Sequence, residues 1–218
     1  GEEIQVLKGH EGVVHSVALS DDGQFIATGG SDRTIRIWDA VSGEQIHSFN
    51  EQESIVRSIA FNHAGSQLVS STSGQQVTSW SLETRSKLLS INSTDRGPVH
   101  SVAFSPDDRQ IIAGCNDGSV RVFDSRKGEL MATLQGHGGP VLHACWSPAG
   151  DRIASAGADN TIKIWDAITG RDILTLSAHD KQVTTVCFGP EGYLLASGGY
   201  DATVRIWDAR PLDAEAKK

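Results

Sequence analysis

Short runs in which apolar and polar residues alternate recur along this chain, separated by clusters of glycine, serine, aspartate and proline. The first four runs cover residues 4–7, 14–19, 25–28 and 34–38. A period of two residues is typical of strands with one buried face, whereas an amphipathic helix needs a period of 3.6 residues. No segment has a helical pattern longer than one turn. The pattern therefore predicts an all-β chain of about 20 short strands.

The strand pattern itself repeats along the chain. Five segments end in similar five-residue sequences, each with an aromatic residue, at positions 38, 80, 123, 165 and 207. The steps between these aromatic residues are 42, 43, 42 and 42 residues. A fixed period of this length indicates stacked units of about four strands each. We expect one domain over residues 1–209 and a solvated tail over 210–218. The expected units are 4–43, 44–85, 86–128, 129–170 and 171–209.

Composition excludes several classes of function. The chain has 19 Lys and Arg residues against 27 Asp and Glu residues, a net charge of −8, which argues against nonspecific binding to nucleic acid or to an anionic membrane. No apolar run approaches the roughly 18 residues that a membrane helix needs. Three cysteines do not make a disulfide framework. We expect Cys145 and Cys187 to be buried and reduced and Cys115 to be partly exposed, which favours a cytoplasmic protein.

The repeat resembles the WD-repeat β-propeller family. Gly9-His10, Gly136-His137 and Ala178-His179 open units, and a Trp-Asp word closes three of the five. The resemblance covers about residues 4–209, and it implies a ring of four-stranded blades. It also implies a hydrogen-bonded tetrad of His, Ser or Thr, Asp and Trp within a blade. The matching positions are His10, Thr28, Asp32 and Trp38; His137, Ser155, Asp159 and Trp165; and His179, Ser197, Asp201 and Trp207.

These tetrads are expected to be structural, although the His, Ser or Thr and Asp of each have the residue types of a catalytic triad. A buried indole N–H and a buried imidazole both need partners, and a short carboxylate in a turn orients the ring. An active site is rarely built three times in one chain, whereas a structural network is needed in every blade. We therefore predict no catalytic residue, no metal site and no cofactor.

Repeats two and three depart from the tetrad pattern. Repeat two has Gln52 in place of His and Gly74 in place of Asp. Repeat three has Asp95 in place of His, Ala113 in place of Ser and Phe123 in place of Trp. We expect packing rather than polar networks to hold these two repeats, and we expect them to be the softer pair.

Length bears on whether the ring closes. Five units of 42 residues need 5 × 42 = 210 residues, which fits a chain of 218, whereas seven would need about 294. We predict five four-stranded blades, with the N-terminal strand Ile4–Leu7 completing the last blade beside Thr203–Trp207 and so removing an exposed edge. The alternatives are an excerpt of a seven- or eight-bladed ring and an assembly of several chains. Self-association is expected if five blades do not close.

The resemblance implies a binding surface at the mouth of the central channel. Two positions in each unit face it, one at the start of the innermost strand and one just before the tetrad Asp. The first set is His15, Arg57, His100, Leu142 and Thr184, and the second set is Ser31, Ser73, Asn116, Ala158 and Tyr200. The residue types differ between units, as in a surface adapted to a ligand.

His15, Arg57 and His100 come from consecutive units and predict a basic mouth on an acidic chain. Such a mouth suits an acidic peptide, a carboxylate or a phosphate, with Arg57 forming a two-point contact and Tyr200 adding an aromatic wall. The predicted function is a non-catalytic scaffold that binds a peptide or protein partner through its loops and channel mouth. The alternative is a small-ligand or carbohydrate binder of the five-bladed lectin type, which should repeat its contact residues in every blade.

Overall fold

The computed structural model describes residues 1–50, 52–93 and 97–209, and the tail predicted over 210–218 lies outside these ranges. The described part is all-β, as the alternation predicts, and it holds no helix of the length and apolar character that crossing a membrane requires. Its strands are β1 (Val14–Leu19), β2 (Phe25–Gly30), β3 (Ile35–Asp39), β4 (Gln45–Phe49), β5 (Val56–Phe61), β6 (Gln67–Thr72), β7 (Gln76–Ser81), β8 (Ser86–Asn92), β9 (Val99–Phe104), β10 (Gln110–Cys115), β11 (Ser119–Asp124), β12 (Leu130–Gln135), β13 (Val141–Trp146), β14 (Arg152–Gly157), β15 (Ile162–Asp166), β16 (Asp172–Leu176), β17 (Val183–Phe188), β18 (Leu194–Gly199) and β19 (Val204–Asp208).

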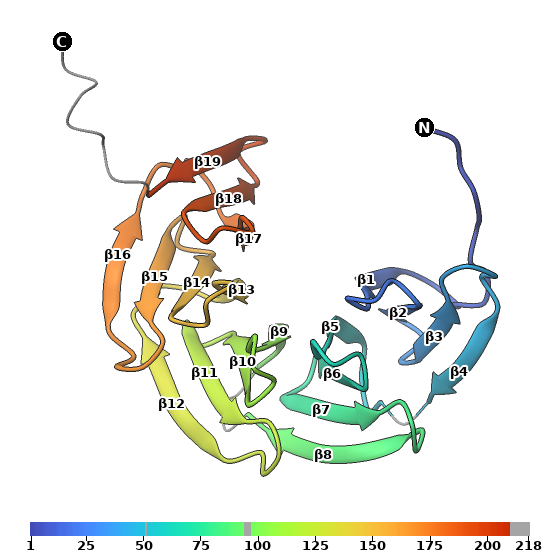
Figure 1. Cartoon of the computed structure of the whole chain (residues 1–218). Helices are drawn as coiled ribbons and strands as arrows, with labels where there is room; N and C mark the ends of the chain where they lie inside the picture. Colours follow the sequence, from blue (N-terminus) through green and yellow to red (C-terminus); the bar gives the residue numbers. More distant parts are fainter. Residues whose placement is uncertain (51, 94–96, 210–218) are drawn as a thin grey trace.

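The strands form five antiparallel sheets in which sequence neighbours pair. Sheets β1–β4, β5–β8, β9–β12 and β13–β16 have four strands each, and the last sheet, β17–β19, has three. Figure 1 shows the sheets side by side along an arc, with the first strand of each sheet at the concave inner edge and the fourth at the outer rim. Each repeat therefore contributes one strand to the inner edge.

The aspartate of the recurring Trp-Asp pair stabilises the turn that follows it. Asp39 Oδ1 accepts hydrogen bonds from the N–H groups of Val41 and Ser42 at 3.0 and 2.7 Å. The bonds from Ser42 and Val41 lower the pKa of Asp39. Gly43 ends the turn with a positive φ of 70°, which a glycine adopts without steric cost. Asp124 and Asp166 make the same turn, so the aspartate fixes the hairpin that leads to the outer strand.

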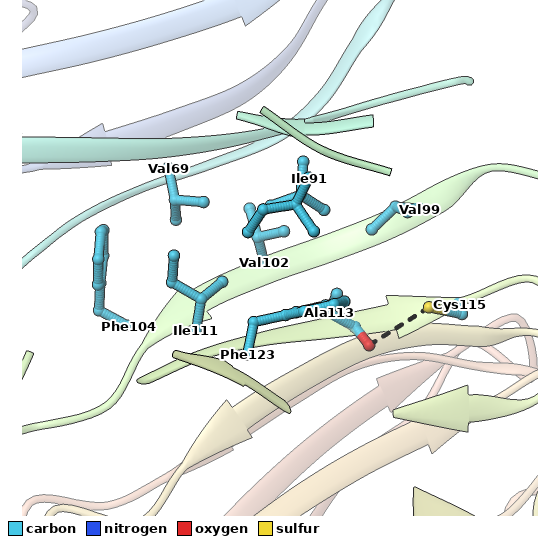
Figure 2. Packing of buried hydrophobic residues seen from close by; sticks show 10 residues of the cluster. Val69, Ile91, Val99, Val102, Phe104, Ile111, Ala113, Cys115 and Phe123 are labelled. Atoms are coloured by element: carbon cyan, nitrogen blue, oxygen red, sulfur yellow. Dashed lines mark hydrogen bonds between the residues drawn. The ribbon is translucent and has the colours of Figure 1, made fainter. Parts of the chain in front are cut away.

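The core is divided among the junctions between neighbouring sheets. Four apolar clusters lie in the described residues, one at each junction. Figure 2 shows the junction of the second and third sheets, where Val69 packs near Val102 and Ile111. Residues of the third strands, such as Ile35 on β3 and Val77 on β7, are fully buried at the junction with the sheet that follows. Each sheet is thus stabilised mainly by its neighbours, as in repeat proteins generally.

The N-terminal strand predicted to complete the last sheet does not form. Residues 4–7 belong to no strand, Ile4 is 98% exposed, and the side chain of Gln5 donates a hydrogen bond to the carbonyl of Ser42. Among the described residues, strand β19 pairs with β18 alone, and Figure 1 shows a gap between the β17–β19 sheet and the β1–β4 sheet. The packing of each junction sets the rotation from one sheet to the next, and four such rotations leave the arc open.

The cysteines differ in burial from the sequence-based expectation. All three are free; Cys115 is buried, Cys145 is half-buried and Cys187 is exposed. Burial raises the pKa of both Cys115 and Cys145 to about 12. Cys187 occupies the position of Cys145 one repeat later, and it is exposed because no sheet follows β17 in the arc.

Candidate binding site at the inner edge of the arc

Every inner strand begins with a β-bulge, and the bulge residue is the first predicted mouth residue of its repeat. In the first sheet, the pairing of β1 with β2 skips His15 between Val14 and Ser16. The other four residues skipped in the same way are Arg57, His100, Leu142 and Thr184. A bulge leaves one residue outside the ladder and changes the direction of its side chain. The sequence shows that these positions are equivalent, but it contains no signal for the bulge.

The second predicted set lies beside the first in every repeat. Each of its residues directly follows the second strand of a sheet, and its backbone N–H donates to the carbonyl two residues before the bulge. These five bonds, 2.8–3.1 Å long, run from Ser31 to Val13, Ser73 to Ile55, Asn116 to Pro98, Ala158 to Pro140 and Tyr200 to Gln182. The backbone is therefore the same in all five repeats, and only the side chains differ.

In two repeats the second residue orients the first. His15 Nε2 lies 2.9 Å from Ser31 Oγ, and His100 Nε2 lies 3.2 Å from Asn116 Oδ1. Burial lowers the pKa of His100, the Asn116 bond opposes this effect, and the charge of Arg57 lowers the pKa further. His100 is therefore a neutral hydrogen-bonding group at pH 7, and the exposed Arg57 supplies the cation.

Neighbouring inner strands are joined side by side. The backbone N–H of Ile59 donates to Ser16 Oγ at 3.0 Å, and that of Val102 donates to Ser58 Oγ at 3.2 Å. These bonds join β1 to β5 and β5 to β9, so the bulges of the first three repeats follow one another along the inner edge. His15, Arg57 and His100 thus form a continuous strip, which we call the basic strip.

The predicted aromatic wall is not part of this strip. Tyr200 is 67% exposed and follows β18 at the far end of the arc, across the gap from β1. A closed ring would have brought repeat five next to repeat one, and the open arc does not. Leu142 and Thr184 lie between them on β13 and β17, half-buried, and Thr184 Oγ1 donates to the carbonyl of Gly198 at 3.1 Å.

The predicted tetrad residues lie within hydrogen-bonding distance of one another in repeats one, four and five. In repeat four, His137 Nδ1 is 3.0 Å from Asp159, His137 Nε2 is 2.8 Å from Ser155 Oγ, and Trp165 Nε1 donates to Ser155 Oγ at 2.8 Å. The other two sets, with contacts of 2.7–3.0 Å, are His10, Thr28, Asp32 and Trp38, and His179, Ser197, Asp201 and Trp207.

The tetrad carboxylates are held in their charged form. Burial raises the pKa of Asp32, but hydrogen bonds from Glu11 N–H, His10 and Thr34 outweigh it and lower the value to about 2. The pKa values of Asp159 and Asp201 are lowered in the same way. Burial also lowers the pKa of His137, against the pull of Asp159. Each tetrad histidine lies in the loop before the first strand of its sheet, and each tetrad aspartate lies in the turn after the second strand, directly after the second mouth residue.

Repeats two and three keep only part of this network. Trp80 Nε1 donates to Ser70 Oγ at 3.0 Å, and Gly74 stands where Asp would be. Gln52 is 5% exposed, and neither polar atom of its side-chain amide has a partner. In repeat three, Ala113 on β10 and Phe123 on β11 are both buried, and these two strands pair with each other. Asp95 lies outside the described residues.

No cluster of three or more His, Cys, Asp or Glu side chains suited to a metal ion occurs in residues 1–50, 52–93 and 97–209. Hollows of about 510 and 460 Å³ lie at the turns between the first and second strands of repeats three to five, at the opposite end of those strands from the bulges.

Comparison with known proteins agrees with the repeat. The model of the family described as WD domain, G-beta repeat matches residues 1–39, 43–81, 86–124, 128–166 and 170–208. The chain belongs to the WD40 repeat family. The five matches cover nearly the whole chain and have the period that the aromatic positions indicated.

Individual relatives are more distant. Protein tipD of Dictyostelium discoideum is 28% identical over 129 residues, 59% of this chain and 14% of that protein. Eukaryotic translation initiation factor 3 subunit I of Lodderomyces elongisporus is 29% identical over 152 residues, 63% of this chain and 43% of that protein. The human serine-threonine kinase receptor-associated protein is 46% identical over 44 residues, which cover 20% of this chain and 13% of that protein. This chain thus spans less than half the length of these relatives.

Proposed function

We propose that this chain is a non-catalytic scaffold that binds a peptide or protein partner at its inner edge. The supporting observation is the set of five bulges, each of which holds a different side chain on the same backbone. A site of this kind is preformed, so little conformational entropy is lost when a partner docks. A lectin-type site is disfavoured, because its contact residues would be the same in every repeat.

The basic strip sets the chemistry of the partner. Arg57 offers a planar fork of N–H donors that suits a carboxylate or a phosphate, and His15 and His100 flank it with further hydrogen-bonding groups. The chain as a whole has a charge of −8, which repels acidic molecules from the rest of the surface. The strip therefore favours an acidic segment of a partner and helps to set its orientation.

Membership of a larger assembly fits the family. WD40 repeat proteins generally bind other proteins, and one relative is named as a subunit of translation initiation factor 3. The three free cysteines are consistent with a reducing compartment such as the cytoplasm. We therefore place the proposed scaffold in a cytoplasmic protein complex.

The test is fluorescence anisotropy with a labelled decapeptide of alternating glutamate and alanine, and with the matching lysine peptide as control. The acidic peptide should bind, and Arg57→Glu should weaken that binding by more than about tenfold without lowering the melting temperature. Arg126→Glu, an equal change of charge in the exposed β11–β12 turn, should leave the affinity within about twofold. Equal losses in both variants would mean that net charge acts rather than the strip, and equal binding of the two peptides would contradict the proposal.

A further inference from the structure

A small apolar hollow lies at the outer rim between the first two sheets, where the β7–β8 turn meets β4 (Figure 1). Its volume is about 170 Å³, and its lining includes Phe25, Ile37, Ile46, Phe49, Leu82 and Arg85. Ile37 and Phe49 are at most 4% exposed, whereas Ile46 is 36% exposed and Arg85 is exposed. The hollow therefore has an apolar floor and an open rim that carries a charge.

The backbone at Arg85 has a conformation that suits glycine. Its φ is 53°, in the left-handed region, where a side chain is strained and glycine is not. The equivalent residues in the turns between the third and fourth strands of repeats one, three and four are Gly43, Gly128 and Gly170, with φ of 70–72°. Strained residues of this kind are concentrated at functional sites. Repeat two thus has an arginine at a position where the other repeats have the better-suited residue.

The arginine also accounts for the hollow. At the next two junctions the turn glycine lies directly against an apolar residue of the preceding outer strand. The two pairs, with the distance from an added Cβ atom, are Gly128 and Ile91 at 3.0 Å, and Gly170 and Leu134 at 3.1 Å. Phe49 is the equivalent residue of β4. Because Arg85 has a Cβ atom, its turn cannot approach Phe49 as closely, and space remains between the turn and the strand.

Two other lining residues make this junction more apolar than its counterparts. Phe25 replaces a polar residue of each of the next three repeats, and Leu82 is larger than its equivalents in repeats one, three and four. These equivalents are Gln67, Gln110 and Arg152 for the first position, and Ala40, Ser125 and Ala167 for the second. An apolar cavity of about 150 Å³ is large enough to bind benzene. The hollow therefore fits one aliphatic or aromatic side chain.

The rim offers two polar groups that can bind an anion. The half-buried His47 also lines the hollow, and its ring packs edge-on against Phe49 with the ring centres 4.5 Å apart. Burial lowers the pKa of His47, and the charge of the neighbouring Arg85 lowers it further, so the imidazole is neutral at pH 7. Within the part of the chain that the structure describes, neither Arg85 nor His47 has a hydrogen-bonding or ion-pair partner. A guanidinium fork beside an imidazole N–H suits a carboxylate.

We propose that this hollow, the rim site, binds a peptide segment of a protein partner in which an aliphatic or aromatic residue lies next to a glutamate or aspartate. The apolar side chain fills the hollow over Ile37 and Phe49, and Arg85 and His47 bind the carboxylate. The partner is a peptide because β4, among the described residues, pairs with β3 alone, and its free outer edge can take an extended chain. The rim site is separate from the basic strip, whose Arg57 lies at the inner edge.

The test is an NMR titration of the isotope-labelled 218-residue chain with a blocked tetrapeptide that has leucine and glutamate between two glycines. The method detects dissociation constants of about 1 mM, which suits a site for a single side chain. The methyl signals of Ile37 and Ile46 should shift and reach saturation. Peptides with glycine in place of leucine, or lysine in place of glutamate, should bind at least about fivefold more weakly at these signals. Ile46→Asp, which adds a negative charge to the rim, should remove the saturable shift.

The arginine is tested by Arg85→Gly, which should weaken peptide binding at least about threefold without lowering the melting temperature, because glycine suits this backbone. Arg33→Gly is the matched control, since Arg33 is also exposed and has a φ of 62°. It and Arg57→Glu should leave binding at the rim site unchanged, and the second variant separates this site from the basic strip. No saturable shift at Ile46, equal losses in the two glycine variants, or a melting temperature lowered by Arg85→Gly alone would each overturn the proposal. So would shifts at Ile46 that appear on concentrating the chain without peptide, because a second copy would then be the occupant.

Discussion

Repeat five has a complete tetrad and a poorly covered tryptophan, whereas repeat two lacks most of the tetrad and buries its tryptophan almost fully. Trp207 is half-buried although its N–H is bonded to Ser197, and Trp80 is 1% exposed although it has only Ser70 as a partner. The difference follows from position in the arc. Repeat two is packed on both sides, and repeat five on one. Neighbouring sheets bury the ring, and the tetrad orients it.

This comparison changes the expected distribution of stability. The missing tetrads suggested that repeats two and three are the softer pair. The structure places both between two neighbours, with Ile111, Val69 and Trp80 buried at their junctions. In a one-dimensional array the stability of a unit depends strongly on its interfaces. We therefore expect the ends of the arc, rather than its centre, to open first.

The largest effect is expected from truncating a tryptophan with two neighbouring sheets. Trp165→Ala should lower the free energy of unfolding by about 3–5 kcal/mol, because it leaves a cavity at a fully buried junction. Trp207→Ala removes the same side chain from the last sheet and should cost at most about half as much. Urea unfolding measures both values. A cost below about 1 kcal/mol for Trp165→Ala, or equal costs at the two sites, would contradict the comparison.

A smaller effect is expected from the tetrad carboxylate. Asp159→Asn should destabilise the protein by about 1.5–3 kcal/mol at pH 7, the range for hydrogen bonds to a charged group. Asp159 accepts such bonds from His137, Gly138 and Thr161. Asp117→Asn is the matched control, because Asp117 makes the same turn contacts to Ser119 in a repeat without the tetrad histidine. If both variants lose equal stability, the turn rather than the His–Asp pair is responsible.

The pH dependence of stability should show the same pair. The pKa of Asp159 is lowered in the folded state, so its contribution is present above the unfolded value of about 3.9 and is lost as the pH falls through the folded value. The pKa of His137 is also lowered, so stability should already begin to fall below about pH 6.5. Unfolding of the parent chain and of Asp159→Asn across this range should converge at low pH. A constant difference down to pH 2 would contradict this assignment.

Hydrogen exchange tests the order of opening directly. The amides of β19 should exchange at least about tenfold faster than those of β7 and β11, which corresponds to about 1.4 kcal/mol less protection. Fastest exchange in repeats two and three would instead restore the sequence-based expectation that the tetrad governs local stability.

The smallest effect is expected at Gln52. Its amide is buried without a hydrogen-bonding partner, which is unfavourable. Gln52→Leu should therefore raise the free energy of unfolding by up to about 1 kcal/mol. Gln182→Leu is the control at an exposed site and should change stability by less than about 0.5 kcal/mol. Destabilisation by Gln52→Leu would mean that the amide has a role in the repeat that its hydrogen bonds do not reveal.

The sequence predicts those features that recur with its period. Strand alternation and the 42-residue step locate all the strands of the structure except that residues 4–7 form none, and the His, Ser or Thr, Asp and Trp residues picked out by their spacing lie within hydrogen-bonding distance in repeats one, four and five. The features it misses depend on geometry that no single repeat contains. Whether five repeats close depends on the summed rotation of four junctions, and the exposure of Cys187 follows from that sum. The bulge at His15 has no compositional signal, because the residues that flank it are ordinary strand formers.

The bulges have a consequence for how such a protein acquires new specificities. A residue outside the ladder, such as Arg57 or Leu142, can be replaced without changing the pairing of any strand. Five positions of this kind have the same backbone conformation, and each lies at the start of the inner strand of its sheet. Under the proposed function, changing the residues at these five positions, by selection or in a combinatorial library, is expected to change the partner while the folding free energy stays nearly the same.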